Sequence, residues 1–268
     1  MSGLSLDLDT PDLADHYEKV SADRQFKVGK LLLRKLALKP GETVLDVGSG
    51  TGLLAAHAAE AVGPTGSVMA IDPLPLRIEI AKRKAQANLT FRVGDAYALG
   101  SYPDASFDVV YLNAVFHWLP EKIGPLLQFH RVLKLGGRLG ITTGSGEHLG
   151  TMQIVRKRVL AREPYASFPV ARAGAAHRVT VKELRDLLTQ IGFVVASMEL
   201  VPNTSVHSCP NAAIKFSQAS SFGNFLGHLP ESLRRSATRD IIRELEAFRT
   251  PEGIRLEGAR IFAVAHKG

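Results

Sequence analysis

The segment VLDVGSGTG, residues 44–52, constrains the fold more than any other part of the sequence. A run of apolar residues leads directly into Gly48, Gly50 and Gly52, and a helical pattern, LLAAHAAEAV, follows at once. Glycines at such places allow a tight turn and a close approach of the backbone to a ligand. A dinucleotide-binding fingerprint, G-x-G-x-x-G, requires glycine where this chain has Leu53. The pattern therefore predicts a strand, a ligand-binding loop and a helix, and it disfavours a nicotinamide-dependent oxidoreductase.

Strands and helices are predicted to alternate beyond this loop. Apolar runs such as SVMAID, LTFRVGD, FDVVYLN and RLGITTG are separated by helical patterns, which indicates a parallel sheet. Further strands are predicted at residues 193–200 and 259–267. Helices are predicted in EKIGPLLQFHRVLK and VKELRDLLTQIG, and Gly136 and Gly192 follow them where a helix C-cap favours glycine.

The segments outside this alternation predict a lid. Residues 12–38 contain an amphipathic helical pattern, and residues 203–255 contain another. The apolar stripe of the second pattern consists of Leu233, Ala237, Ile241, Leu245 and Phe248. Residues 149–179 also lie outside the alternation. An open α/β sheet binds its ligand at the carboxyl ends of the strands, so we expect all three segments there. The predicted organisation is one domain over 1–268, with a strap (12–38), a binding core (39–202 and 256–268) and a helical cap insertion (203–255).

Charge and cysteine content narrow the classes of function. The net charge of +7 arises in residues 151–268, which carry 17 Lys and Arg against 10 Asp and Glu. Such an excess accompanies nucleic acids, anionic membrane surfaces or anionic substrates, and it also occurs on solvated basic faces. The single cysteine, Cys209, excludes an internal disulfide and a cysteine-rich metal site. The sequence shows neither a leader pattern nor a run of about 18 apolar residues, so we expect a cytoplasmic protein.

Two acidic residues complete the ligand-binding pattern. Asp72 ends the strand SVMAID, 20 residues after Gly52, where a ribose-binding carboxylate is expected. Asp95 follows the third predicted strand, in VGDA. The Asp72 carboxylate can accept hydrogen bonds from both ribose hydroxyls, and Asp95 with the amide of Ala96 can recognise the adenine edge. The ordered set predicts a ligand that contains adenosine.

Residues 44–144 resemble the core of class I S-adenosylmethionine (SAM)-dependent methyltransferases, in the branch of the ubiquinone-biosynthesis and trans-aconitate enzymes. The resemblance implies an α/β fold with a Rossmann-like, doubly wound, seven-stranded sheet whose last strand, ARIFAVAHK, is antiparallel. It implies that the glycine loop holds the methionine part of SAM, with Asp46 fixing the loop and the amino group, Asp72 the ribose, and Asp95 and Ala96 the adenine. The cofactor-binding residues expected on this basis are Asp46, Gly48, Ser49, Gly50, Thr51, Gly52, Asp72, Pro73, Asp95, Ala96 and Asn113.

Two residues are candidates for the chemistry. The segment LNAVFHWLP is similar to the N-A-x-x-x-W-L segment of trans-aconitate-type enzymes, in which the residue corresponding to Asn113 lies beside the transferred methyl group. His117 in this segment is the candidate acid or base, because imidazole titrates near neutral pH. Packing beneath Trp118 is the alternative for that side chain. Tyr17 in the strap is the second candidate, because an aromatic face favours the sulfonium cation, although simple packing also accounts for it.

The same regions bear on the substrate class. Related enzymes that act on nucleic-acid bases or amides carry Asn or Asp followed by Pro-Pro-aromatic where this chain has Asn113, Ala114, Val115 and Phe116, so nucleic acid is not favoured. No metal is predicted, because the fifth strand is followed by only Glu147 and His148 as potential ligands. Arsenite methyltransferases share this core, but they need several thiolates.

The cap sequence is compatible with two chemical classes of methyl acceptor. Inward-facing arginines would favour a carboxylate or phosphate on the acceptor, and inward-facing aromatic residues an apolar one. The aromatic set is Tyr165, Phe168, Phe216, Phe222 and Phe225, and the basic set is Arg156, Lys157, Arg158, Arg162, Arg235, Arg239 and Arg243.

The predicted function is metal-independent, O-directed transfer of a methyl group from SAM to a small-molecule metabolite by in-line displacement. Transfer to carbon or nitrogen, or to RNA or protein through the basic second half, stays open. A non-catalytic nucleotide-binding regulator is a further alternative. The sequence makes no prediction of oligomeric state.

Overall fold

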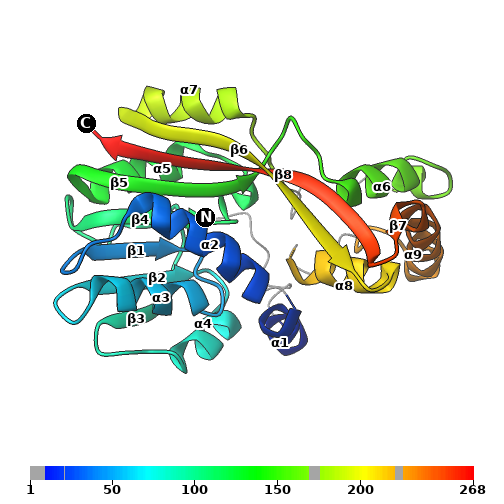
Figure 1. Ribbon diagram of the computed structural model, residues 1–268, viewed down its shortest axis with the longest axis horizontal. Coiled ribbons are helices and arrows are strands. Elements are labelled where there is room, and N and C mark those ends of the chain that lie inside the picture. The colour runs from blue at the N-terminus through cyan, green and yellow to red at the C-terminus, as the bar shows by residue number, and fades with distance from the viewer. Residues whose placement is uncertain (1–9, 21, 169–175, 221–225) are drawn as a thin grey trace.

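A mixed β-sheet forms the centre of the molecule in the computed structural model, which describes residues 10–20, 22–168, 176–220 and 226–268. The strands are β1 (Thr43–Val47), β2 (Ser67–Asp72), β3 (Leu89–Val93), β4 (Phe107–Asn113), β5 (Leu133–Gly144), β6 (Phe193–His207), β7 (Arg249–Thr250) and β8 (Gly253–Lys267). Their order is β3-β2-β1-β4-β5-β8-β6, and the two-residue β7 pairs with β8 (Figure 1). Strands β1 to β5 pair in parallel, and β8 is antiparallel to β5 and β6. The expected Rossmann-like sheet with its antiparallel last strand is confirmed.

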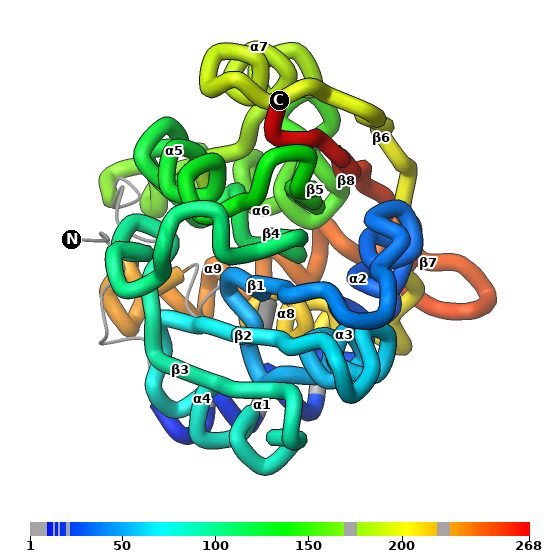
Figure 2. Tube along the Cα trace, turned by 90° about the vertical axis from the view of Figure 1, so that its left-hand side faces the viewer, coloured from blue at the N-terminus to red at the C-terminus, as the bar shows by residue number. Residues whose placement is uncertain are grey.

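Helices cover both faces of this sheet. The α-helices are α1 (Pro11–Val20), α2 (Ala22–Leu36), α3 (Leu53–Val62), α4 (Pro75–Lys82), α5 (Ile123–Val132), α6 (Thr151–Leu160), α7 (Val181–Ile191), α8 (Pro210–Ser220) and α9 (Glu231–Leu245). Figure 2 shows α2 and α3 on one side of the sheet and α5 on the other. One buried cluster joins the sheet to α2, α3 and α4, and a second joins it to α5 and α7. This two-sided burial explains why the central strands β1 and β4 are mostly apolar.

A third buried cluster forms the cap, at the side of the sheet toward which β1 points (Figure 1). It packs α6, α8 and α9 together with the near end of β8. The apolar stripe predicted on α9 lies in this cluster: Ala237, Ile241 and Leu245 are fully buried, and Leu233 packs against them. The wider division into strap, core and cap insertion stays a prediction.

The structure differs from the prediction in the end of one helix and in the lengths of two strands. The helix ending near Gly136 stops at Val132, and Leu133 already pairs with Phe107 in the sheet. Gly136, with φ +70°, lies within β5 where the pairing register shifts, so it shapes a bulge and does not cap a helix. Gly192 does adopt the left-handed conformation that ends α7. Strands β6 and β8 are also longer than predicted, because they continue past the core as a paired ribbon that reaches the cap.

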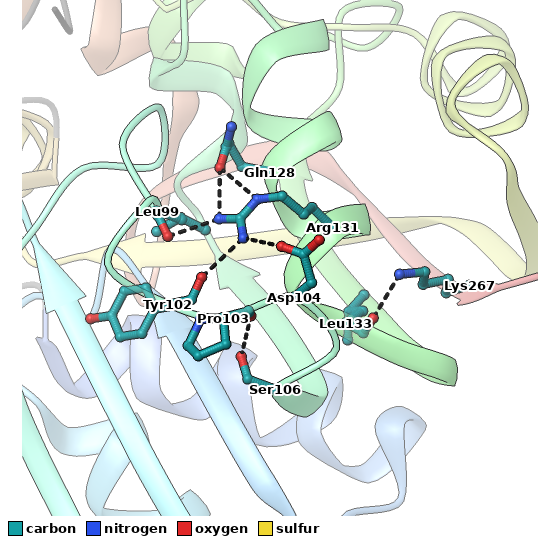
Figure 3. A network of polar contacts seen from close by, with 9 residues as sticks. All are labelled: Leu99, Tyr102, Pro103, Asp104, Ser106, Gln128, Arg131, Leu133 and Lys267. Carbon is teal, nitrogen blue, oxygen red and sulfur yellow. Dashed lines mark hydrogen bonds and ion pairs between the residues drawn. The ribbon is translucent and has the colours of Figure 1, made fainter.

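The loop before β4 is fixed by one arginine (Figure 3). Arg131 on α5 donates hydrogen bonds to the carbonyl oxygens of Leu99 and Tyr102, at 2.9 Å each, and to the carboxylate of Asp104 at 2.6 Å. Its guanidinium also contacts Gln128. Arg131 is therefore a structural arginine whose donors are taken up by this protein, at the end of the sheet opposite the cap.

Candidate active site

The glycine loop after β1 adopts backbone conformations that favour glycine. Gly48, Gly50 and Gly52 have φ values of +79°, +56° and +88°. A Cβ atom on Gly48 would lie 2.3 Å from the Val115 side chain, and one on Gly52 would lie 2.7 Å from the Phe91 ring. The loop is therefore packed tightly on its protein side, and glycine is required there for both conformation and space.

Replacing Gly48 by alanine is expected to destabilise the fold by about 2–3 kcal/mol, through strain at positive φ and overlap with Val115. For a protein of this size that loss lowers Tm by roughly 5–10 °C, which differential scanning calorimetry detects.

Gly136→Ala is the matched control, because Gly136 has a similar φ of +70° and nothing lies within 4 Å of its Cβ position. It retains the conformational strain and lacks the overlap. An equal fall of Tm in both variants would contradict the packing argument.

Asp72, at the end of β2, supports the glycine loop through hydrogen bonds. Its carboxylate accepts hydrogen bonds from the amides of Gly50 at 2.9 Å and Leu74 at 3.0 Å, and the residue is only 3% exposed. The carbonyl oxygen of the preceding residue, Ile71, accepts from the amides of Gly48 and Ser49. The end of β2 thus holds the loop in place. Asp72 is not among the residues that line the cavity described below, so its role as the ribose ligand stays a prediction.

Asp46 is a second buried carboxylate of the loop. It accepts a hydrogen bond of 2.7 Å from the Tyr111 hydroxyl and is 2% exposed. Burial raises the pKa of Asp46 from its ordinary 3.8 to about 7; the Tyr111 hydrogen bond opposes this rise and the charge of Asp72 adds to it. Asp46 therefore titrates close to neutral pH.

A small, partly open cavity adjoins the loop. Its lining includes Asp46, Thr51 and Asn113, together with Gln25 and Phe26 from α2. Ser49 lines it too, and the buried Ser49 Oγ has no hydrogen-bond partner among the described residues. A buried hydroxyl without a partner is costly, and a polar ligand in this cavity could satisfy it.

The strap closes over the loop through Tyr17 on α1. A Cβ atom on Gly50 would lie 3.1 Å from the Tyr17 ring, so the ring rests on the glycine. The Arg77 guanidinium stacks on the same ring, with Cζ 4.2 Å from its centroid, and burial raises the pKa of the Tyr17 phenol. An ion pair of 2.8 Å between Glu18 and Lys84 ties the strap to the segment after α4.

The remaining residues predicted to bind the cofactor flank this region without lining the cavity. Pro73 lies between Asp72 and the start of α4 and is half-buried. Asp95 accepts a hydrogen bond from the Tyr97 amide at 3.0 Å, and Ala96 is buried in the core. The Asp72 carbonyl oxygen accepts from the Gly94 amide, so the ends of β2 and β3 lie side by side.

Asn113 connects the end of β4 to the strap. Its amide nitrogen donates to the Gln25 carbonyl oxygen at 2.9 Å, and its amide oxygen accepts from the Thr142 hydroxyl at 2.7 Å. The next residue, Ala114, has a φ of +60°, a costly conformation for alanine. The same Thr142 hydroxyl stabilises it, by accepting from the Ala114 amide at 3.0 Å.

His117 lies in a positively charged environment. Its Nδ1 is 3.1 Å from the Thr143 hydroxyl and 3.5 Å from the Gly144 amide, which can only donate, so we place the proton of the neutral ring on Nε2. Burial, with the charges of Arg178, Arg260 and Lys122, holds the pKa of His117 well below its usual value. The ring also contacts Trp118, as the packing alternative expects, so both hypotheses for this residue stay open.

Comparison with known proteins assigns the core. Residues 45–141, which run from β1 into β5, match the family model described as a methyltransferase domain. The chain contains a methyltransferase domain. This match includes the glycine loop, Asp72, Asp95, Asn113 and His117. It confirms the resemblance to methyltransferases that the sequence analysis identified.

The methyltransferase domain has relatives with different substrates in their names. An arsenite methyltransferase of Halobacterium salinarum is 42% identical over 113 residues, which cover 40% of this chain and 28% of that protein. A demethylmenaquinone methyltransferase of Lactobacillus johnsonii is 33% identical over 138 residues, covering 48% of this chain and 56% of that protein. This chain thus spans little more than half of one relative and under a third of the other.

The fold of the methyltransferase domain is shared with solved structures. A SAM-dependent methyltransferase from Aquifex aeolicus superposes with a TM-score of 0.52 at 21% identity, covering 70% of this chain and 92% of that one.

No helix among the described residues is long and apolar enough to cross a membrane.

Three of the basic residues predicted in the cap pair with acidic residues of α9, whereas the charge of Arg178 acts on Arg156 of the same set. Arg158 and Arg162 pair with Glu244, and Arg243 pairs with Asp240. Among the aromatic residues, Tyr165 is buried in the cap and bonds Asp240, whereas Phe222 and Phe225 lie outside the described residues. Sequence reasoning missed the arginines that do lie beside the site, which are Arg24, Arg178 and Arg260, because each stands alone in its segment.

Proposed function

We propose that this protein is a SAM-dependent methyltransferase that acts on a small molecule. The carrying observation is the cavity at the glycine loop, where the buried Ser49 hydroxyl lacks a partner among the described residues and the Asp46 carboxylate is adjacent. These groups fit the amino and carboxylate groups of a methionine moiety, and Asp72 below Gly50 fits a ribose.

SAM, when bound, supplies a methyl group on a positively charged sulfur atom. The protein's part is to align the acceptor in line with that group and to exclude water. Asp46, Ser49 and Asn113 would hold the methionine end, Pro73 would flank the ribose at Asp72, and Asp95 with Ala96 would hold the adenine. Tyr17 would cover the site with its aromatic face, which favours a cation.

The acceptor atom is proposed to be oxygen, without a metal ion. The support for an oxygen acceptor is the similarity of LNAVFHWLP to trans-aconitate-type enzymes, together with His117 beside this segment. A neutral His117 with its proton on Nε2 can donate a hydrogen bond to an acceptor oxygen, and it can accept a proton only at the cost of charge beside Arg178 and Arg260. Transfer to carbon or nitrogen is the alternative on the same core.

Calorimetric titration with S-adenosylhomocysteine tests the proposal, with NADH as the comparison ligand. We expect a dissociation constant in the micromolar range for S-adenosylhomocysteine and no measurable binding of NADH, because Leu53 stands where a dinucleotide site requires glycine. Absence of binding by S-adenosylhomocysteine, or preference for NADH, would overturn the proposal.

A further inference from the structure

Three arginines from distant parts of the chain converge beside the candidate site. Arg24 lies on α2, Arg178 precedes α7, and Arg260 lies on β8. Arg260 pairs in register with Gly144 at the end of β5, and a Cβ atom on Gly144 would lie 3.0 Å from Arg178 Nε. Arg260 also donates to the Gln25 side chain at 3.3 Å, next to Arg24. The three guanidinium groups therefore belong to one site.

These arginines lack the acidic partners that arginines usually have. Among the described residues, no carboxylate lies within ion-pair distance of Arg24, Arg178 or Arg260. Arg24 instead stacks on the Phe216 ring of the cap, with Cζ 4.7 Å from the centroid. The contrast is Arg131 in Figure 3, whose guanidinium is bound by one carboxylate and two carbonyl oxygens.

The unbalanced positive charge is costly for the folded protein. Burial and the neighbouring charges of Arg24 and Arg178 lower the pKa of Arg260 to about 10. Burial and the charge of Arg178 lower the pKa of Arg156, on α6, to about 10 as well. Like charges brought together in a partly dehydrated site destabilise a fold, and proteins retain such arrangements where a ligand compensates for them.

The cluster borders the groups placed at the chemistry. Gln25, which bonds Arg260, accepts through its carbonyl oxygen from Asn113. The His117 carbonyl oxygen accepts from the His177 amide at 2.7 Å, immediately before Arg178. The arginines thus lie next to His117 and Asn113, outside the matched segment 45–141.

We propose that Arg24, Arg178 and Arg260 form a subsite for an oxyanion group, a carboxylate or a phosphate, on the methyl acceptor. This inference rests on the proposed function. Guanidinium groups bind both oxyanions through paired, charge-assisted hydrogen bonds. Since the three arginines come from the strap, the core and the segment before α7, a bound oxyanion would also fasten these elements together.

Titration with small oxyanions tests the subsite. Inorganic phosphate and malonate are titrated separately into the wild type, Arg178→Met, Arg260→Met and Arg239→Met, with and without saturating S-adenosylhomocysteine. Arg239 is the matched control, because it is exposed on α9, donates to the Ser236 hydroxyl at 3.0 Å and loses the same charge on substitution. One of the two oxyanions will bind the wild type more tightly. We expect Arg178→Met and Arg260→Met to lower the affinity for that oxyanion about tenfold or more, and Arg239→Met to change it less than about twofold. The tighter of the two probes identifies the group.

Two further measurements separate the alternatives. The affinity for S-adenosylhomocysteine should stay within about threefold of wild type in every variant; a parallel loss would mean that the arginines hold the cofactor carboxylate, and it would overturn the subsite. An equal loss of oxyanion affinity in all three variants would also overturn the subsite, because binding would then depend only on net charge.

Stability and charge controls complete the test. Arg178→Met should keep or raise Tm, because it removes like-charge repulsion, and Arg178→Lys should retain part of the oxyanion affinity. Wild-type protein that binds phosphate through Arg178 and does not bind S-adenosylhomocysteine would refute the proposed function and leave the oxyanion site standing.

Discussion

Asp72→Ala is expected to weaken binding of S-adenosylhomocysteine by at least about 100-fold. Two hydrogen bonds from ribose hydroxyls to an ionised carboxylate contribute about 1.5–3 kcal/mol each, and the substitution removes both. It also deprives the Gly50 amide of its acceptor, so the loop loses support where the ligand would lie. Isothermal titration calorimetry measures the loss directly.

Asp72→Asn and Asp186→Ala are the companions to this variant. Asparagine keeps one acceptor oxygen, so its loss of affinity should be smaller than that of alanine. Asp186 is exposed on α7 and pairs with Lys182, so its removal should leave the affinity unchanged. Wild-type affinity in Asp72→Ala would show that this carboxylate only supports the loop.

Asp46→Asn is expected to change how stability depends on pH. The pKa of Asp46 in the folded protein, about 7, is higher than its ordinary 3.8, so between these values the folded protein binds more protons than the unfolded chain. The contribution of Asp46 to stability therefore falls as pH rises through this interval, by up to about 1.4 kcal/mol per pH unit, and is constant above it. Asparagine does not titrate, so the variant lacks this decline.

Urea denaturation at pH 5, 6, 7 and 8 checks this expectation. The difference in free energy of unfolding, Asp46→Asn minus wild type, should increase up to pH 7 and stay constant above it. Tyr111→Phe removes the hydrogen bond that lowers the pKa of Asp46, so in that variant the decline should extend to higher pH. Parallel pH curves for wild type and Asp46→Asn would refute the assignment.

Local patterns predicted the sheet well because they act over a few residues. The alternation of apolar runs and helical stripes predicted that β1 to β5 pair in parallel, and the glycines at 48, 50 and 52 marked a loop that adopts positive φ. The error at Gly136 has the same origin. A glycine after a helical pattern indicates a C-cap, but pairing of Leu133 with β4 ends the helix earlier, and that contact is not local.

The basic surroundings of His117 could not be predicted in the same way. Arg178 and Arg260 are isolated in sequence, and only the antiparallel insertion of β8 beside β5 brings Arg260 next to Gly144. The clustered arginines of α6 and α9 gave a stronger signal in the sequence, yet Arg158, Arg162 and Arg243 pair with acidic residues on the cap itself. Of the clustered arginines, only Arg156 lies near the site, where the charge of Arg178 acts on it. The other arginines of the site come from single positions that are distant in sequence.

The paired ribbon of β6 and β8 gives the molecule a modular boundary. The cap segment leaves β6 at His207 and returns in β8 at Ile254, and these two residues are direct partners in the ladder. Any segment whose ends lie one strand spacing apart can be joined there without altering the sheet. The helices between its strands, α8 and α9, can therefore be exchanged during evolution, or by design, while the glycine loop and the carboxylates that support it keep their positions.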